Sequence, residues 1–153
     1  MDCFFDNQMR LEQLMPLMEE FLAQGKPVIF APRGISMLPM LRQGVDKVVL
    51  ESYKGILRKF DIPLYQRDDG HFVLHRVVRV GDTYTCIGDN QYELEHGVRQ
   101  DQIIAIVTGF YRGDKYYSTK NLGYKLYSRI WCYSRGLRLF VRRSLGWLRR
   151  RLR

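Results

Sequence analysis

Short apolar segments separated by turn residues fill the middle of the chain and restrict its fold more than any other feature. They occupy residues 28–30, 46–51, 62–65, 71–80, 83–87 and 103–110, with Gly and Asp concentrated between them. A strand spacing of roughly ten residues with such turns is typical of all-β domains. We therefore predict a mostly β domain over residues 27–114, in which residues 71–80 form one long strand.

An amphipathic helix is expected ahead of this domain. Apolar residues recur at helical spacing over residues 7–24, and Gly25 ends the pattern. Pro16 lies inside the segment and predicts a kink or a late start. Residues 1–26 are therefore expected to form an N-terminal helix that packs on the β domain.

The charge of the chain is concentrated at its C-terminal end. Residues 1–114 hold 13 of the 25 Lys and Arg residues and all 16 Asp and Glu residues, whereas residues 115–153 hold the other 12 basic residues and no acidic one. Apolar residues and two tryptophans, Trp131 and Trp147, alternate with these arginines near helical spacing. Residues 115–153 are thus predicted to be a basic, partly helical, amphipathic extension, with helix breaks at Gly123, Gly136 and Gly146.

Three interpretations of this extension follow from its composition. Arginines beside an apolar face favour an anionic membrane surface, which we rank first. A solvated extension comes second. Nucleic acid comes last, because the acidic balance of residues 1–114 gives no basic domain and residues 1–26 are too few for a DNA-binding domain.

Several classes of protein are disfavoured by the sequence. No uncharged run approaches the roughly 20 residues of a membrane-spanning helix, and the N-terminus does not resemble a secretory signal. Cys3, Cys86 and Cys132 are scattered, with no spacing typical of a disulfide framework or a metal site. We expect a cytoplasmic protein, peripheral on the inner membrane face if the extension binds lipid, with no metal or other cofactor.

A serine turn and a histidine in an apolar segment suggest chemistry. Ser36 lies in Gly34-Ile35-Ser36-Met37-Leu38-Pro39, a turn that can expose its hydroxyl. His75 lies in the predicted strand 71–80 and is the best base of the three histidines. A serine hydroxyl becomes a nucleophile when a base takes its proton, so the pair predicts acyl transfer.

Four segments in order carry a family resemblance. The serine turn is followed by Gly44-Val45-Asp46-Lys47-Val48-Val49, then Leu74-His75-Arg76-Val77, then Gly88-Asp89-Asn90. Together, over about residues 28–112, they resemble the LexA/signal-peptidase group of serine peptidases. Histidine at position 75, where bacterial members have lysine, is similar to the endoplasmic-reticulum and archaeal branch. The chain also looks like short soluble members from Bacteroides-type bacteria.

This resemblance implies a fold and a set of roles. The fold would be a LexA/signal-peptidase-like β-ribbon catalytic domain. Ser36 would attack the scissile carbonyl, its backbone N–H would contribute to the oxyanion hole, and His75 would act as general base. Met37 and Pro39 would contact substrate.

The acid that orients the histidine is left open by the sequence. Asp89 matches the family's acidic turn and is ranked first. Glu95 stands near the position of a second family aspartate, and Glu93 is the third candidate.

The resemblance implies a serine endopeptidase that cuts a leader, signal or precursor peptide. The alternative is a non-catalytic or regulatory LexA-like binding module, tethered by residues 115–153 to membrane or nucleic acid. The distance between Ser36 and His75 in the folded chain would distinguish the two.

Overall fold

The computed structural model describes residues 3–4, 11–138 and 140 of the chain. Strands predominate among its elements. In chain order these are β1 (Cys3–Phe4), α1 (Leu11–Ala23), β2 (Val28–Phe30), β3 (Asp46–Ser52), β4 (Pro63–Gln66), β5 (Phe72–Leu74), β6 (Arg76–Val80), β7 (Tyr84–Ile87), β8 (Glu95–Val98), the 3₁₀ helix η1 (Gln100–Gln102), β9 (Ile103–Arg112), β10 (Lys115–Ser118) and α2 (Leu122–Tyr133).

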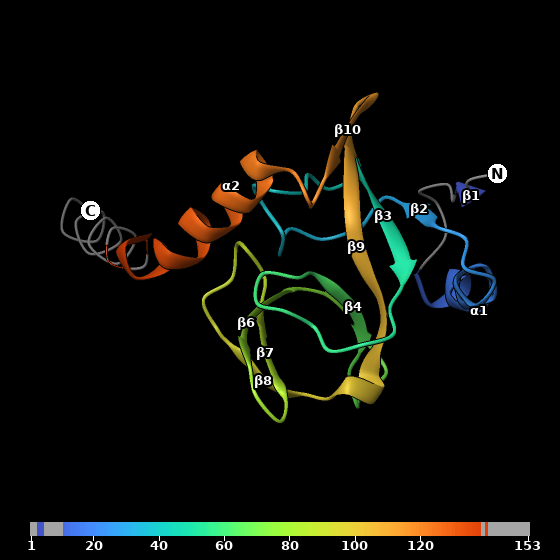
Figure 1. The fold of residues 1–153 in the computed structure, drawn as a ribbon, viewed down its shortest axis with the longest axis horizontal. Helices are drawn as coiled ribbons and strands as arrows, with labels where there is room; N and C mark the ends of the chain where they lie inside the picture. Colours follow the sequence, from blue (N-terminus) through green and yellow to red (C-terminus); the bar gives the residue numbers. More distant parts are fainter. Residues whose placement is uncertain (1–2, 5–10, 139, 141–153) are drawn as a thin grey trace, which may run out of the picture.

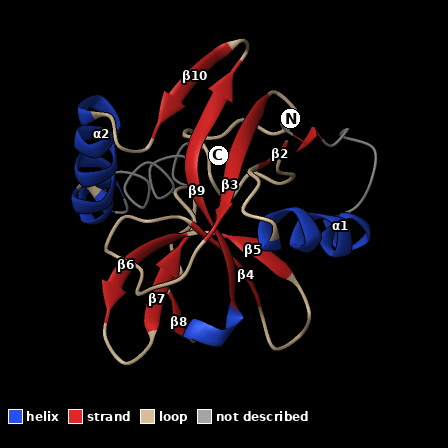
Figure 2. Ribbon diagram, turned by 45° about the vertical axis from the view of Figure 1, so that its right-hand side comes forward, coloured by secondary structure: helices blue, strands red, loops and turns tan. Residues whose placement is uncertain are grey.

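The described strands form two sheets. The larger has seven strands in the order β1-β2-β3-β9-β4-β5, with β10 also paired to β9, and the smaller has the order β6-β7-β8. The ten-residue strand β9 runs through the larger sheet and pairs with β3, β4 and β10. Figure 2 shows the smaller sheet below the part of the larger sheet that holds β3, β9 and β10.

The prediction of a mostly β domain is confirmed, with one strand corrected and three missed. Residues 71–80 do not form one strand, because the chain leaves the larger sheet after Leu74 and enters the smaller one at Arg76. The sequence analysis did not predict β8, β10 or β1, and β1, which pairs with β2, lies within the region 1–26 that was expected to be helical. Because β10 pairs with β9, residues 115–118 belong to the sheet and not to a separate extension.

Helix α1 packs on the larger sheet through its apolar face. Met18 is completely buried, and Leu14, Met15 and Leu22 are nearly so, in one cluster with residues of β2, β3, β4 and β9. Pro16 lies within the helix. The predicted helix is confirmed over residues 11–23, and the part of the prediction on residues 5–10 lies outside the described residues.

A second cluster joins the two sheets. Tyr65 of β4, Val77 of β6 and Cys86 of β7 have no exposed surface and pack together. The backbone of Val77 adds two hydrogen bonds of 2.8 Å across the junction, donating to Asp61 O and accepting from Phe60 N. The junction between the sheets is therefore held by apolar packing and by backbone pairing.

Helix α2 follows β10 and lies on the opposite side of the molecule from α1 (Figure 1). Asn121 caps it by accepting a hydrogen bond of 2.7 Å from the N–H of Gly123. A turn at Ser134 interrupts the helical conformation, which resumes at residues 135–138. The predicted breaks at Gly123 and Gly136 are wrong, since both residues are helical, and Gly146 lies outside the described residues.

Within the described residues, no helix has both the length and the apolar character needed to cross a bilayer.

Candidate active site

The turn that carries Ser36 is a tight, hydrogen-bonded segment between β2 and β3. The N–H of Leu38 donates to Ile35 O at 3.2 Å, and the N–H of Leu41 donates to Met37 O at 2.9 Å. Gly34 enters the turn with φ at +96°, a conformation that residues with a side chain rarely adopt. Ser36 is half-buried at this turn.

The segment Gly88-Asp89-Asn90, which follows β7, packs directly on this turn. Asn90 N–H donates to Ser36 O at 2.7 Å, and its side-chain amide donates to Ile35 O at 3.2 Å. A Cβ atom on Gly88 would lie 2.7 Å from Ser36 O and 3.0 Å from Ser36 Cβ. Only glycine at position 88 therefore allows the two segments to approach this closely.

His75 lies beside the same glycine. It stands between β5 and β6, and the antiparallel register pairs the next residue, Arg76, with Ile87. Continued by one residue, this register puts the backbone of His75 next to Gly88. The predicted nucleophile and base, 39 positions apart in the sequence, thus both neighbour Gly88.

The imidazole of His75 is enclosed and faces a carboxylate. Only 4% of its side-chain surface is exposed, and its Nδ1 lies 3.3 Å from the Tyr65 hydroxyl and 3.4 Å from Glu95 Oε2. Burial lowers the pKa of His75, and the opposing charge of Glu95 does not restore it. The imidazole is therefore neutral at pH 7, as a general base must be.

Glu95 is held in place by two neighbours. Arg67 donates from Nε to Oε1 and from Nη2 to Oε2, both at 2.6 Å, and the Tyr65 hydroxyl donates to Oε2 at 2.6 Å. Burial alone would raise the pKa of this carboxyl, but the hydrogen bonds from Arg67 and Tyr65 outweigh burial and lower it. The ionised Glu95 is thus fixed against His75 Nδ1.

Asp89, ranked first from the sequence, pairs with a different residue. Arg76 Nε donates to its Oδ1 at 2.8 Å and Arg76 Nη2 to its Oδ2 at 2.7 Å, with the side chains 0% and 1% exposed. Both carboxylate oxygens are therefore engaged by the guanidinium. Among the three candidate acids, the structure brings Glu95 and not Asp89 into contact with the imidazole.

The guanidinium of Arg76 connects several parts of the molecule. Its Nη1 donates to the Tyr124 hydroxyl of α2 at 2.8 Å and to Phe60 O at 3.3 Å, and its Nη2 lies 3.0 Å from Met40 Sδ. The Arg76–Asp89 pair thus joins β6, the loop after β7, the serine turn and α2.

Other predicted positions are also placed by the structure. Glu93 is exposed, and no described contact joins it to His75. Met37 is 4% exposed and belongs to the core cluster under α1, which corrects its assignment as a substrate contact. Pro39 is exposed, as a substrate contact requires.

Helix α2 and the residues that follow it donate hydrogen bonds to the segment 89–92, which packs on the serine turn. Trp131 Nε1 donates to Asp89 O at 2.9 Å, Arg138 Nη1 donates to the same oxygen at 3.3 Å, and Arg135 donates to Tyr92 O. The Arg138 guanidinium also lies 3.7 Å from the centre of the Trp131 ring. The sequence analysis did not find these contacts, because their spacing along the chain carries no signal.

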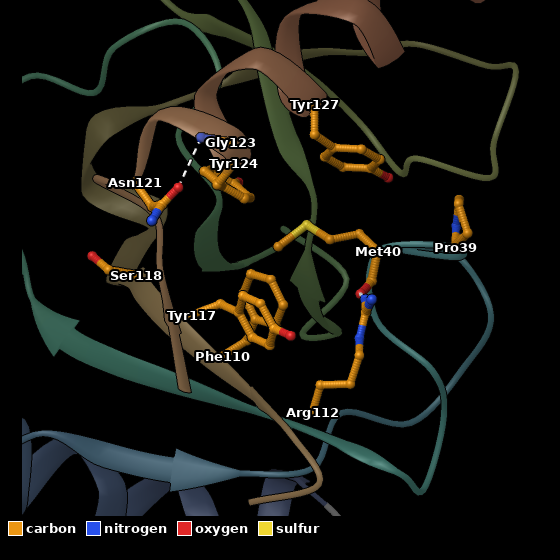
Figure 3. A pocket seen from close by; sticks show the side chains of 10 residues that line it. All are labelled: Pro39, Met40, Phe110, Arg112, Tyr117, Ser118, Asn121, Gly123, Tyr124 and Tyr127. Carbon is orange, nitrogen blue, oxygen red and sulfur yellow. Dashed lines mark hydrogen bonds between the residues drawn. The ribbon is translucent and has the colours of Figure 1, made fainter. Parts of the chain in front are cut away.

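A pocket of about 320 Å³ opens beside Pro39 and Met40 of the serine turn (Figure 3). Its walls come from four elements: Pro39 and Met40 from the turn, Phe110 and Arg112 from β9, Tyr117 from β10, and Tyr124 and Tyr127 from α2. The rings of Phe110 and Tyr117 stack with their centres 5.4 Å apart. The Tyr127 hydroxyl is buried and has no hydrogen-bond partner among the described residues.

The hydroxyl and the backbone N–H of Ser36 are the two groups that acyl transfer would use. Within the described residues, no hydrogen bond engages the hydroxyl or the N–H of Ser36, and none joins Ser36 to His75. Hydrogen bonds between catalytic groups are often long without substrate and tighten when substrate binds. The same part of the chain contains no cluster of three or more His, Cys, Asp or Glu side chains that could hold a metal ion.

Comparison with known proteins assigns no family to this arrangement. No family model matches the chain, and none of the curated proteins matches it.

Proposed function

We propose that this chain is a serine endopeptidase, with Ser36 as nucleophile, His75 as general base and Glu95 as the orienting acid. One observation carries the proposal: a buried histidine has its Nδ1 3.4 Å from a carboxylate held by Arg67 and Tyr65, and the next residue pairs with Ile87, the neighbour of the glycine that packs on Ser36. In this proposal the three residues, which come from separate segments, act in the order that a serine–histidine–acid mechanism needs.

The chemistry follows from the two ring nitrogens of His75. With its Nδ1–H facing Glu95, Nε2 is free to accept the proton of the Ser36 hydroxyl as Ser36 Oγ attacks the substrate carbonyl carbon. The Ser36 N–H would stabilise the oxyanion that forms. The imidazolium then gives its proton to the leaving amine as the C–N bond breaks. Water, deprotonated by His75, hydrolyses the acyl-enzyme and regenerates Ser36.

The substrate class is suggested by the edge of the larger sheet. Strand β5 ends the described strand order, and it leads directly into His75. An extended peptide can pair with such an edge, which would hold its backbone along the site. This supports a leader, signal or precursor peptide as substrate.

The test is a digest of a peptide library, read by mass spectrometry, with the native protein and two variants. Ser36→Ala and His75→Ala should each reduce cleavage by at least about 10³-fold. Ser52→Ala and His71→Ala serve as controls because both residues are exposed and no described contact joins the side chain of either to Ser36, His75 or Glu95. Cleavage that survives Ser36→Ala would refute the proposal.

The absence of a described hydrogen bond between Ser36 and His75 favours one alternative, a non-catalytic peptide-binding module of the same fold. A folded native protein that cleaves no peptide of the library, yet retains extended peptides in a pull-down, would establish it.

A further inference from the structure

The outward face of α2 and the residues after it carries a row of large apolar side chains. They are exposed by 82% at Leu122, 61% at Leu126, 58% at Ile130, 70% at Tyr133 and 66% at Leu137. Steps of three and four residues put the first four on one side of α2, and Leu137 follows after the turn at Ser134. We call these five residues the outer stripe.

The inward face of the same segment is already occupied. Trp131 and Arg138 bind Asp89 O, and Tyr124 binds the buried Arg76 guanidinium. The inward face therefore already packs its aromatic rings on the core and makes the polar contacts, and the outer stripe is a second apolar face that the described residues leave uncovered. A row of exposed large apolar side chains of this kind marks an interaction surface.

The charges beside the outer stripe indicate the kind of surface it meets. Lys125 and Arg129 are exposed on the same helix, and the Lys59 ammonium lies 4.9 Å from the centre of the Tyr133 ring. Residues 115–153 contain no acidic residue that could oppose a negative partner. An anionic lipid surface matches this arrangement, because its acyl chains can take up the apolar row while its negative headgroups bind the flanking cations.

We propose that α2 is an in-plane membrane anchor that inserts the outer stripe into an anionic lipid surface, with Lys59, Lys125 and Arg129 contacting the headgroups. This goes beyond peptidase activity and does not depend on it. A protein partner with an acidic rim and a second copy of this chain are the competing occupants, and the test separates them.

The experiment is flotation of the full chain with phosphatidylcholine vesicles that contain phosphatidylserine, and with vesicles of phosphatidylcholine alone. The native protein should float with the anionic vesicles, much less with the neutral ones, and less as salt increases. The Leu126→Ser/Ile130→Ser double variant should bind at least about tenfold more weakly, because each buried aliphatic side chain contributes more than a factor of ten. Lys125→Gln/Arg129→Gln should weaken binding only to the anionic vesicles.

Leu17→Ser is the matched control for the apolar variant. Leu17 is also an exposed helical leucine, 44% accessible, but it lies on α1, across the molecule from α2. Its variant should float like the native protein, and circular dichroism should show that all variants are folded. Equal flotation of native protein and the double variant would overturn the proposal. So would a native protein that ignores lipid and forms dimers, measured by sedimentation velocity, that the double variant abolishes.

Discussion

At the scale of single residues, the candidate site depends on which carboxylate faces His75. Glu95 is fixed by Arg67 and Tyr65 and lies against His75 Nδ1. Both carboxylate oxygens of Asp89 instead accept hydrogen bonds from Arg76. The negative charge of Glu95 raises the pKa of His75, although burial keeps that pKa below its usual value. Glu95 should therefore act on both the orientation and the titration of the base.

Glu95→Gln tests this role through the pH dependence of cleavage. In the native protein, kcat/KM should increase with pH through a midpoint below about 6.5, the ordinary pKa of histidine. Removing the Glu95 charge lowers the pKa of His75 further, so this midpoint should move to lower pH. The maximal rate should also fall by roughly 10²-fold or more, since the imidazolium loses its partner. The exposed Glu93, changed to Gln, should leave both unchanged, and a midpoint that moves upward in Glu95→Gln would contradict the assignment.

The contact between Gly88 and Ser36 gives a second prediction at this scale. A methyl group at position 88 would overlap the Ser36 backbone and Cβ, so Gly88→Ala must displace the serine turn. Because a misplacement of about 1 Å can cost about 10²-fold in rate, cleavage should decrease by at least that factor. Gly81→Ala is the control, since its nearest new contact would be 3.7 Å away. Native cleavage rates in Gly88→Ala would show that Ser36 need not hold this position.

At the scale of the elements, the sequence predicts the strands better than their pairing. The segment from Phe72 to Val80 is rich in valine and other apolar residues, so the sequence predicts one strand. The strand is interrupted at His75 because the chain passes there from the larger sheet to the smaller one. Strand β8 begins at Glu95 and contains Gly97, so its local pattern is weak, and it forms because it pairs with β7. Glu95 lies at the start of this strand, so its contact with His75 was not visible in the sequence, and Asp89 was ranked first on its match to the family's acidic turn.

The position of Ser36 and His75 could be predicted only through resemblance and motif. Neither composition nor periodicity places a serine turn against the loop after β7, because that contact is made by a glycine without a side chain, one backbone hydrogen bond and one hydrogen bond from the Asn90 side chain. The hydrogen bonds from α2 and the residues after it to the same loop could not be predicted either. They use single side chains, Trp131 and Arg138, on carbonyl oxygens that any sequence would provide.

Two tyrosines of α2 offer a matched test of how this element is held. Tyr124 accepts a hydrogen bond from Arg76, whereas the buried Tyr127 hydroxyl has no partner within the described residues. Tyr127→Phe should therefore leave stability unchanged or increase it by about 1 kcal/mol, and Tyr124→Phe should reduce it by about 1–3 kcal/mol. Urea unfolding measures both. A loss of stability in Tyr127→Phe would show that its hydroxyl has a partner in solution.

At the scale of the whole molecule, the buried Arg76–Asp89 pair connects the smaller sheet and the serine turn to α2. A charged pair in the interior is expensive to break, because the remaining charge stays buried without a partner. This places Asp89 among the residues that hold the fold together, and gives it an effect that differs from that of a catalytic acid.

Asp89→Asn should lower the free energy of unfolding by about 3–5 kcal/mol, measured by urea denaturation. Asp82→Asn, at the exposed turn between β6 and β7, should change it by less than about 0.5 kcal/mol. If Asp89→Asn unfolds at the same urea concentration as the native protein but no longer cleaves peptides, Asp89 is a catalytic residue and not a structural one.

The two faces of α2 have a consequence for how the protein would find its substrate. The inward face fixes the loop beside Ser36, so a protein lying on a lipid surface by its outer stripe would carry its site at a constant height above the headgroups. Search would then take place in a thin layer, where a substrate tethered to the same surface has a raised effective concentration. The protein would then select its substrates by their presence on the same surface. A sheet edge that accepts many peptide sequences would be sufficient for specificity.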